Sequence, residues 1–116
     1  MLILAIDIGG GTQDILLFDS LKTVENCVKM VMPSPAIALS QKVMSATARK
    51  RPILFTGVNM GAGPAKGSLK RHISAGFATY ATPEAACTFY DDPDRVREMG
   101  ITIVSADEAK KLKDVE

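Results

Sequence analysis

The sequence predicts an α/β fold with one mixed five-stranded sheet and flanking helices, in the order β-β-β-α-β-α-β-α. Two observations lead to this prediction. Three short segments rich in aliphatic and β-branched residues come first, before any helical pattern. Two further apolar segments then alternate with stretches of helical periodicity, which is typical of strands joined by helical crossovers. A chain of 116 residues corresponds to a single domain, and its 47% apolar content indicates a globular protein.

The first three segments are expected to form antiparallel strands. Leu2–Ile8 is almost entirely apolar and is predicted as a buried first strand. Gln13–Asp19 has the aliphatic content of a second strand. After a polar turn at Ser20–Asn26, Cys27–Met32 is a third strand, which ends at Pro33 because proline cannot donate to a ladder.

A helix is expected between the third strand and the fourth. Ser34 is a suitable N-cap and Pro35 suits the first helical position, so a helix is predicted to run to about Lys50. Pro52–Thr56 is then expected as a fourth strand and Ile101–Val104 as a fifth.

Four more helices are predicted in the second half of the chain. The first spans about Pro64 to Ala75, and Gly76 is a natural residue to end it. Short helices follow with Thr82 as N-cap and over Asp91–Met99. A charged terminal helix begins after Ser105.

The most informative motif joins the first two strands through Gly9, Gly10 and Gly11. Glycine tolerates positive φ and allows backbone amides to approach an anion closely. Successive amides in such a turn form a concavity that binds anions. The sequence therefore predicts a phosphate-binding turn, although an ordinary Gly-rich β-hairpin is the alternative.

Polar residues on either side of these glycines suit a Mg²⁺–phosphate group. Asp7, at the end of the first strand, is the predicted metal ligand, since Mg²⁺ prefers oxygen ligands and retains several waters. Thr12 adds a hydroxyl donor, and Gln13 or Asp14 could orient a water. In the alternative hairpin, the two aspartates are only turn acids.

The eight residues from Asp7 to Asp14 read Asp-x-Gly-Gly-Gly-Thr-x-Asp. They resemble the phosphate-binding hairpin of the actin, Hsp70 and sugar-kinase ATPase superfamily, and the element order resembles the ribonuclease-H-like fold on which that superfamily is built. The resemblance implies Mg-ATP bound in a cleft between two such subdomains. Because this chain supplies one subdomain, we expect a fragment or truncated form of a longer protein, or one half of a self-assembling pair.

A second resemblance covers nearly the whole chain. It is to a family labelled as pyruvate formate-lyase activating enzymes, in the segments Ala5–Asp14, Glu25–Lys29, Gly57–Gly63, Tyr80–Ala86 and Arg95–Gly100. Such enzymes need a CxxxCxxC cluster for an iron–sulfur centre that uses S-adenosylmethionine. Two distant cysteines, Cys27 and Cys87, cannot hold that centre, so we expect no iron–sulfur cluster and no radical chemistry of this kind.

A second Gly-rich loop follows the fourth strand and precedes a helix. Its amides can point at an anion, and the resemblance to sugar kinases implies acceptor-substrate contacts there. The predicted substrate contacts are Gly57, Asn59, Gly61 and Gly63. The alternative is a strand–helix turn that uses glycine for its backbone geometry. The sole histidine, His72, is expected at the surface or rim of the next helix.

Charge is segregated along the chain although the net charge is only +1. Residues 26–83 contain eight basic residues and no acidic one: Lys29, Lys42, Arg49, Lys50, Arg51, Lys66, Lys70 and Arg71. This stretch either faces an anion such as a nucleotide, or lies on solvated helix faces balanced by the acidic tail. Nucleic-acid binding is disfavoured because no recognised motif is present, and a nuclease because the stretch lacks carboxylates for a two-metal site.

No basic region precedes the first apolar run, and no stretch approaches about 20 apolar residues. We therefore expect no membrane contact and, by default, a cytoplasmic protein. The expected function is Mg-ATP phosphate binding in a subdomain of an ATPase or kinase, with a second subdomain or a homodimer partner. The alternative is a binding or assembly module without catalysis.

Overall fold

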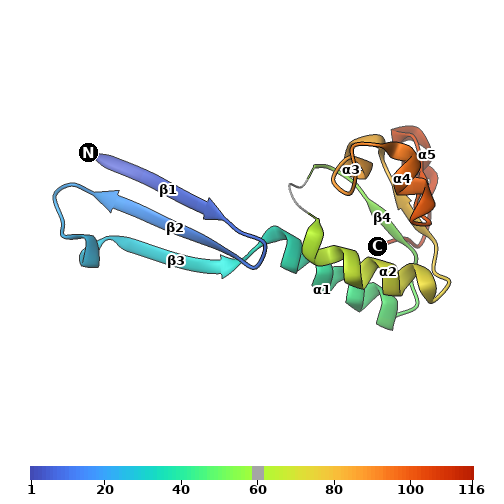
Figure 1. Cartoon of the computed structure of the whole chain (residues 1–116), viewed down its shortest axis with the longest axis horizontal. Coiled ribbons are helices and arrows are strands. Elements are labelled where there is room, and N and C mark those ends of the chain that lie inside the picture. Colours follow the sequence, from blue (N-terminus) through green and yellow to red (C-terminus); the bar gives the residue numbers. More distant parts are fainter. Residues whose placement is uncertain (59–61) are drawn as a thin grey trace.

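A computed structural model of the chain describes residues 1–58 and 62–116 (Figure 1). A three-stranded antiparallel sheet extends from one end of a lobe in which helices pack around a three-stranded parallel sheet. The molecule measures 54 × 26 × 25 Å. Its Cα radius of gyration is 17.7 Å, whereas a compact chain of this length has roughly 13 Å. The antiparallel sheet therefore projects away from the lobe.

The projecting sheet has the order β1-β2-β3, with β1 at Leu2–Ile8, β2 at Thr12–Asp19 and β3 at Val28–Pro33. The bounds of all three predicted strands are confirmed to within one residue. The expectation that the first strand is buried was wrong, because every residue of β1 is exposed on the projecting sheet, where none of the described helices covers it. A 3₁₀ turn, η1 (Val24–Asn26), lies in the predicted polar connection between β2 and β3.

The pairing register shows which side chains share a face of this sheet, because residues directly opposite each other point to the same side. One face, here called the apolar face, carries Leu2, Leu4, Ile6, Ile8, Gln13, Ile15, Leu17, Asp19, Val28, Met30 and Met32. The other, here called the Asp7 face, carries Ile3, Ala5, Asp7, Thr12, Asp14, Leu16, Phe18, Lys29, Val31 and Pro33.

The lobe contains the parallel sheet in the order β4-β5-β6, with β4 at Ile53–Phe55, β5 at Thr79–Ala81 and β6 at Thr102–Ile103. β4 and β6 are shorter than the predicted strands. The sequence-based prediction had no strand at β5, where it placed a turn, and this was wrong. A three-residue strand is too short to show periodicity, yet β5 is central because both neighbours pair with it.

The mixed α/β class is confirmed, but the described residues form two sheets rather than one five-stranded sheet. β5 lies between β4 and β6, so the parallel strands form a sheet of their own. The outer edge of β4 is bonded to the last residue, Glu116, instead of β1. The Leu54 amide donates to the Glu116 carbonyl at 2.8 Å, and the Glu116 amide donates to the Pro52 carbonyl at 3.0 Å.

Two helices lie side by side along one side of β4 in Figure 1. α1 spans Pro35–Ala48, and its predicted N-cap, Ser34, accepts a hydrogen bond from the Ile37 amide. α2 spans Lys66–Ser74 and follows the 3₁₀ turn η2 (Gly63–Ala65). Together, η2 and α2 account for the single helix predicted there.

Three short helices lie on the other side of β4 in Figure 1: α3 (Pro83–Ala86), α4 (Pro93–Glu98) and α5 (Ala106–Lys111). The predicted cap of α5 is confirmed as a reciprocal capping box between Ser105 and Glu108. Among the described residues, no helix has both the length and the apolar character needed to cross a bilayer.

The core of the lobe is small and rich in alanine. Small side chains let the helices approach the parallel sheet closely, and Leu69 and Val96 are its largest fully buried apolar residues. The cluster consists of Val43, Ala46, Ile53, Ala62, Leu69, Ala81, Ala85, Ala86, Phe89, Val96 and Ile101.

His72 is fully buried, so the expectation of a surface or rim position was wrong. Its Nδ1 lies 2.8 Å from the Thr47 hydroxyl oxygen, and its ring lies 5.3 Å from that of Phe77. Its Nε2 has no hydrogen-bond partner within the described part of the chain. The flanking lysine and arginine suggested exposure, but helical rotation places His72 on the face of α2 that carries Leu69.

The stability of the protein is expected to fall as the pH drops through about 6.5, because burial lowers the pKa of His72 below that value while the Ala78 backbone partly offsets the effect. The unfolded chain then binds the proton more readily than the folded chain. The stabilisation is therefore complete above pH 6.5 and is lost as the pH falls toward the lower, folded pKa. Urea unfolding at several pH values between 5.5 and 7.5 measures this loss of stability. These two limits lie about one unit below and above the ordinary histidine pKa of about 6.5.

In the matched variant His72→Gln, this pH dependence is expected to disappear between pH 5.5 and 7.5. Glu25 and Glu108 have lowered pKa values because of backbone hydrogen bonds, so they titrate below this window. An identical slope in the wild type and the variant would contradict the assignment to His72.

Candidate functional site

The turn between β1 and β2 lies where the projecting sheet meets the lobe, beside the start of α1 (Figure 1). The Gly9 amide is used inside the turn, because it donates to the Thr12 carbonyl at 2.8 Å. Within residues 1–58 and 62–116, the amides of Gly10 and Gly11 donate no hydrogen bond. The turn therefore retains two adjacent backbone donors for an anion.

Ser34 fixes this turn to the start of α1. Its side chain donates to the Gly10 carbonyl at 2.8 Å, and its amide donates to the Gly11 carbonyl at 3.0 Å. Ser34 is fully buried, so these bonds are sheltered from water. The turn is thus held beside the N-terminus of a 14-residue helix, the end that carries partial positive charge.

The same turn also contacts the segment that follows the second Gly-rich loop. A Cβ added to Gly10 would lie 3.7 Å from the Pro64 side chain in η2. The structure therefore brings the end of the second loop against the predicted phosphate turn, although the two are far apart in the sequence.

Asp7 and Asp14 lie directly opposite each other across β1 and β2, and both are exposed. The Thr12 hydroxyl donates to an Asp14 carboxylate oxygen at 3.1 Å. The three predicted side chains therefore share the Asp7 face, next to the turn. Asp7 and Asp14 also line an open hollow of about 400 Å³ with Lys29, a site residue that the sequence analysis placed only in a basic stretch.

This arrangement offers two carboxylates to a cation. Mg²⁺ is commonly held by one or two carboxylates, with waters and substrate phosphates completing the octahedron, so the donor set fits that metal. In the part of the chain that the structure describes, no group of three or more His, Cys, Asp or Glu side chains gathers to form a closed metal site. A cation here would need ligand and water oxygens.

Gln13 lies on the other face of the sheet, so it is separated from Asp7 and Asp14. It is opposite Met32, and its amide nitrogen lies 3.9 Å from the methionine sulfur. The alternation of side chains along a strand dictates this result. Of the two residues predicted to orient a water, only Asp14 lies on the side of Asp7.

Two of the four predicted substrate contacts can be placed. Gly57 follows β4 with a φ of +75°, a conformation that favours glycine, and Gly63 begins η2. Asn59 and Gly61 lie outside the described residues.

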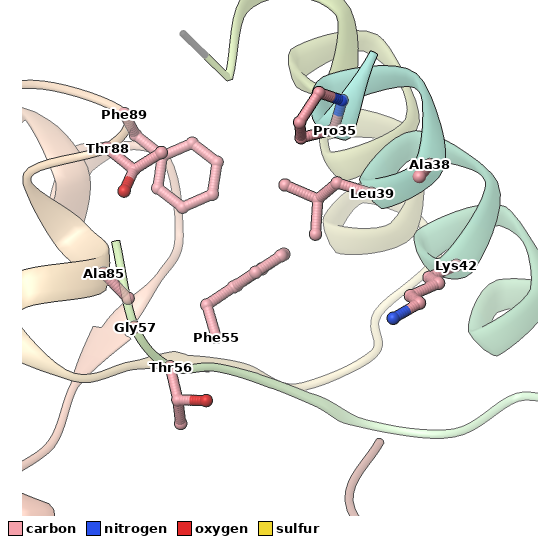
Figure 2. A pocket seen from close by; sticks show the side chains of 10 residues that line it. All are labelled: Pro35, Ala38, Leu39, Lys42, Phe55, Thr56, Gly57, Ala85, Thr88 and Phe89. Atoms are coloured by element: carbon pink, nitrogen blue, oxygen red, sulfur yellow. The ribbon is translucent and has the colours of Figure 1, made fainter. Parts of the chain in front are cut away.

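Gly57 lines a cavity of about 280 Å³ between α1, the end of β4 and the segment around α3. Figure 2 shows Leu39, Phe55 and Phe89 converging on it. The rings of Phe55 and Phe89 meet edge to face, with centroids 5.1 Å apart and an interplanar angle of 74°. This cavity has no signature in the sequence, because its lining comes from three separate elements.

Part of the basic stretch is neutralised by the C-terminal tail. Arg49 pairs with Glu116, and Arg51 lies 3.9 Å from Asp114 and 4.0 Å from Glu116. Lys66 instead stacks over the Tyr90 ring, with its Nζ 4.1 Å from the centroid. For the two arginines, the structure supports the interpretation of charge balance by the acidic tail.

Comparison with known families gives one result. A family model described as "Putative pyruvate format-lyase activating enzyme (DUF1786)" matches residues 60–116, which extend from the second Gly-rich loop to the end of the chain. No curated protein and no solved structure matches the chain. The two cysteines are both free, with Cys27 buried beside the projecting sheet and Cys87 exposed on the lobe. The sequence similarity therefore covers the part of the lobe from η2 onward, whereas the projecting sheet with its Gly-rich turn, α1 and β4 lie outside it.

Proposed function

We propose that this chain binds the phosphates of a Mg²⁺-nucleotide, ATP in the first instance, as a subdomain of an ATPase or kinase. The observation that carries the proposal is the geometry of the turn. Among the described residues, the amides of Gly10 and Gly11 donate no hydrogen bond, and they lie beside the paired carboxylates of Asp7 and Asp14, at the positive end of α1. Amide donors suit phosphate oxygens, and the carboxylates suit the metal that accompanies them.

Each part has a distinct task. Asp7 would hold Mg²⁺ directly or through its waters, and the glycine amides would bind phosphate oxygens. The Thr12 hydroxyl, which donates to Asp14 here, could turn to a phosphate oxygen and free Asp14 to orient a water. Phosphoryl transfer depends mainly on positioning and on stabilising charge, so these groups would act only in a complete cleft.

The resemblance to the actin, Hsp70 and sugar-kinase superfamily supports the same proposal and extends it. In that arrangement, a ribonuclease-H-like subdomain forms one wall of the cleft and a second subdomain forms the other. We therefore propose that a second subdomain or a second copy of this chain completes the nucleotide site.

Replacing Asp7 with asparagine is expected to weaken Mg-ATP binding by at least roughly tenfold, because the affinity of an oxygen site for a divalent cation depends on the number of its charged ligands. Calorimetric titration with Mg-ATP measures the effect. The variant should fold at least as well as the wild type without ligand, since removing one of two opposed like charges relieves repulsion.

The matched control is Asp107→Asn, which removes an exposed carboxylate in the first turn of α5. It should bind Mg-ATP as the wild type does. Equal binding by the wild type and the Asp7 variant would show that the carboxylate is not a metal ligand and would remove the main support for the proposal.

The second candidate function, an assembly module, is favoured by the exposure of the projecting sheet. Leu2, Ile8 and Leu4 are 67%, 62% and 61% exposed. Contiguous apolar surface of this kind usually marks an interaction site. A second copy of the chain fits this surface, because the apolar face carries no basic residue and only one acid, Asp19, at the end remote from the lobe. Two such faces can meet without opposed charges at their centre.

A further inference from the structure

We infer that the cavity between α1, β4 and α3 binds a small organic anion with an apolar body. This site is separate from the Gly9–Thr12 turn, and its occupancy does not depend on nucleotide binding. Among the residues that the structure describes, the lining consists of Pro35, Ala38, Leu39, Lys42, Phe55, Thr56, Gly57, Ala85, Thr88 and Phe89.

The apolar part of the ligand follows from the walls. Leu39 from α1, Phe55 from β4 and Phe89 beyond α3 direct their side chains toward the same space in Figure 2. The volume of about 280 Å³ equals that of roughly nine water molecules in the liquid. A ring with a short substituent, about ten non-hydrogen atoms in all, therefore matches the space.

The anionic group follows from Lys42, the one charged side chain among the described residues of the lining. Figure 2 shows its ammonium on the side of α1 that borders the cavity. Within the described part of the chain, Lys42 makes no ion pair. The Glu116 carboxylate lines the neighbouring cavity together with Lys42, but it is paired with Arg49.

A neighbouring cavity shows why Lys42 rather than an arginine is the anchor. This second space, of about 460 Å³, shares Leu39, Lys42 and Phe55 with the first. Its arginine, Arg49, is already paired with Glu116. Lys42 is therefore the cation left for a ligand.

The position of the cavity leaves it open to a ligand. It opens at the carboxyl end of β4, which pairs in parallel with β5. The backbone at this end turns away at Gly57, with its positive φ, and leaves room beside Phe55.

The test titrates the whole chain with 3-phenylpropionate and with its neutral isostere 3-phenylpropanamide. Calorimetry and the backbone amide chemical shifts of the protein monitor the binding. The wild type is expected to bind the acid with a dissociation constant on the order of a millimolar or tighter, as suits a ligand of this size. The amide should bind about three- to fivefold more weakly, since a solvent-accessible charge pair contributes little more.

Three variants complete the test. Lys42→Met keeps the apolar stem of the side chain and should reduce binding of the acid to the level of the amide, whereas Lys70→Met, outside the lining, should have no effect. Ala38→Phe, at an exposed position of α1, should fill the cavity and abolish binding of both probes.

The inference would be overturned by absent binding, by equal affinity for acid and amide, or by binding that survives Ala38→Phe. Chemical-shift changes confined to the apolar face of the projecting sheet would equally contradict binding in the cavity. Asp7→Asn should leave phenylpropionate binding unchanged, so failure of this site and failure of the nucleotide site are distinguishable.

Discussion

Replacing Gly100 with alanine is expected to lower the free energy of unfolding by about 2–4 kcal/mol. Gly100 has a φ of +94°, which costs a residue with a Cβ about 1–2 kcal/mol. The new Cβ would also lie 2.8 Å from Cγ2 of Ile73, and such overpacking typically costs about 1–3 kcal/mol. Ile73 is β-branched and packs against the core, so its methyl group cannot easily move. Urea unfolding measures the loss.

Gly76→Ala is the matched control for the part of the stability loss that comes from positive φ alone. Gly76 also has a positive φ, +85°, but an added Cβ would meet nothing within 4 Å. Its loss of stability should be smaller than that of Gly100→Ala. In the double variant Ile73→Ala/Gly100→Ala, the clash is gone, so the two losses should be less than additive. Strict additivity would show that the contact between Gly100 and Ile73 does not limit stability.

Replacing Ile6 with lysine is expected to weaken self-association of the chain by more than about 100-fold. Ile6 lies in the middle of the apolar face, in a row with Ile15 and Met30. In a two-fold dimer the substitution buries two unpaired charges against apolar surface, and each tenfold loss corresponds to about 1.4 kcal/mol. Sedimentation velocity over a series of protein concentrations measures the association.

For the assembly candidate, the size of the face predicts a weak and reversible dimer. Three strands of about seven residues form a flat rectangle of roughly 24 by 14 Å. The two faces of a dimer would therefore bury about 700 Å² in total, without the extra area that protruding side chains add. Specific interfaces usually exceed about 1,200 Å², which places this contact at the weak end. An antiparallel arrangement of the two sheets would keep the two Asp19 carboxylates apart, because they lie at the ends remote from the lobes.

Ile3→Lys is the matched control, since it places the same charge on the same strand but on the Asp7 face. It should leave the dimer intact. Equal dissociation by the two variants would contradict the choice of face, and a monomeric wild type at all concentrations would remove the assembly candidate. If the chain remains monomeric and binds Mg-ATP, the nucleotide-binding function alone stands.

Local signals in the sequence predicted much of the fold. Ser34 and Ser105 cap the helices that they were expected to cap, because a hydroxyl before a helical pattern acts within one turn. Gly76 and Gly100 end their helices with positive φ, as glycine at this position commonly does. The three N-terminal strands were predicted because each is long enough to show its composition.

The features that the sequence did not reveal depend on tertiary packing. β5 has three residues, so its pairing with β4 and β6 carries no periodic signal. The separation of the two sheets depends partly on Glu116, whose backbone bonds to the edge of β4 have no local signature. The burial of His72 likewise depends on how α2 packs, not on the charged residues beside it in the sequence.

For the candidate site, the sequence predicted the residues in and around the turn, but not which face of the sheet each side chain lies on. Alternation along β2 separates Gln13 from Asp14, which the motif alone does not show. The contact of Gly10 with Pro64 and the bonds from Ser34 arise only when the chain folds back on itself.

The most direct test of the account is an amide chemical-shift titration of the isotope-labelled chain with Mg-ATP, with Mg²⁺ alone as the reference. We expect the amide signals of Gly10 and Gly11 to shift most, followed by that of Thr12, and Asp7→Asn to suppress these shifts. Unchanged glycine amides at saturating Mg-ATP, or shifts confined to the lobe, would contradict the assignment of the turn as a phosphate site.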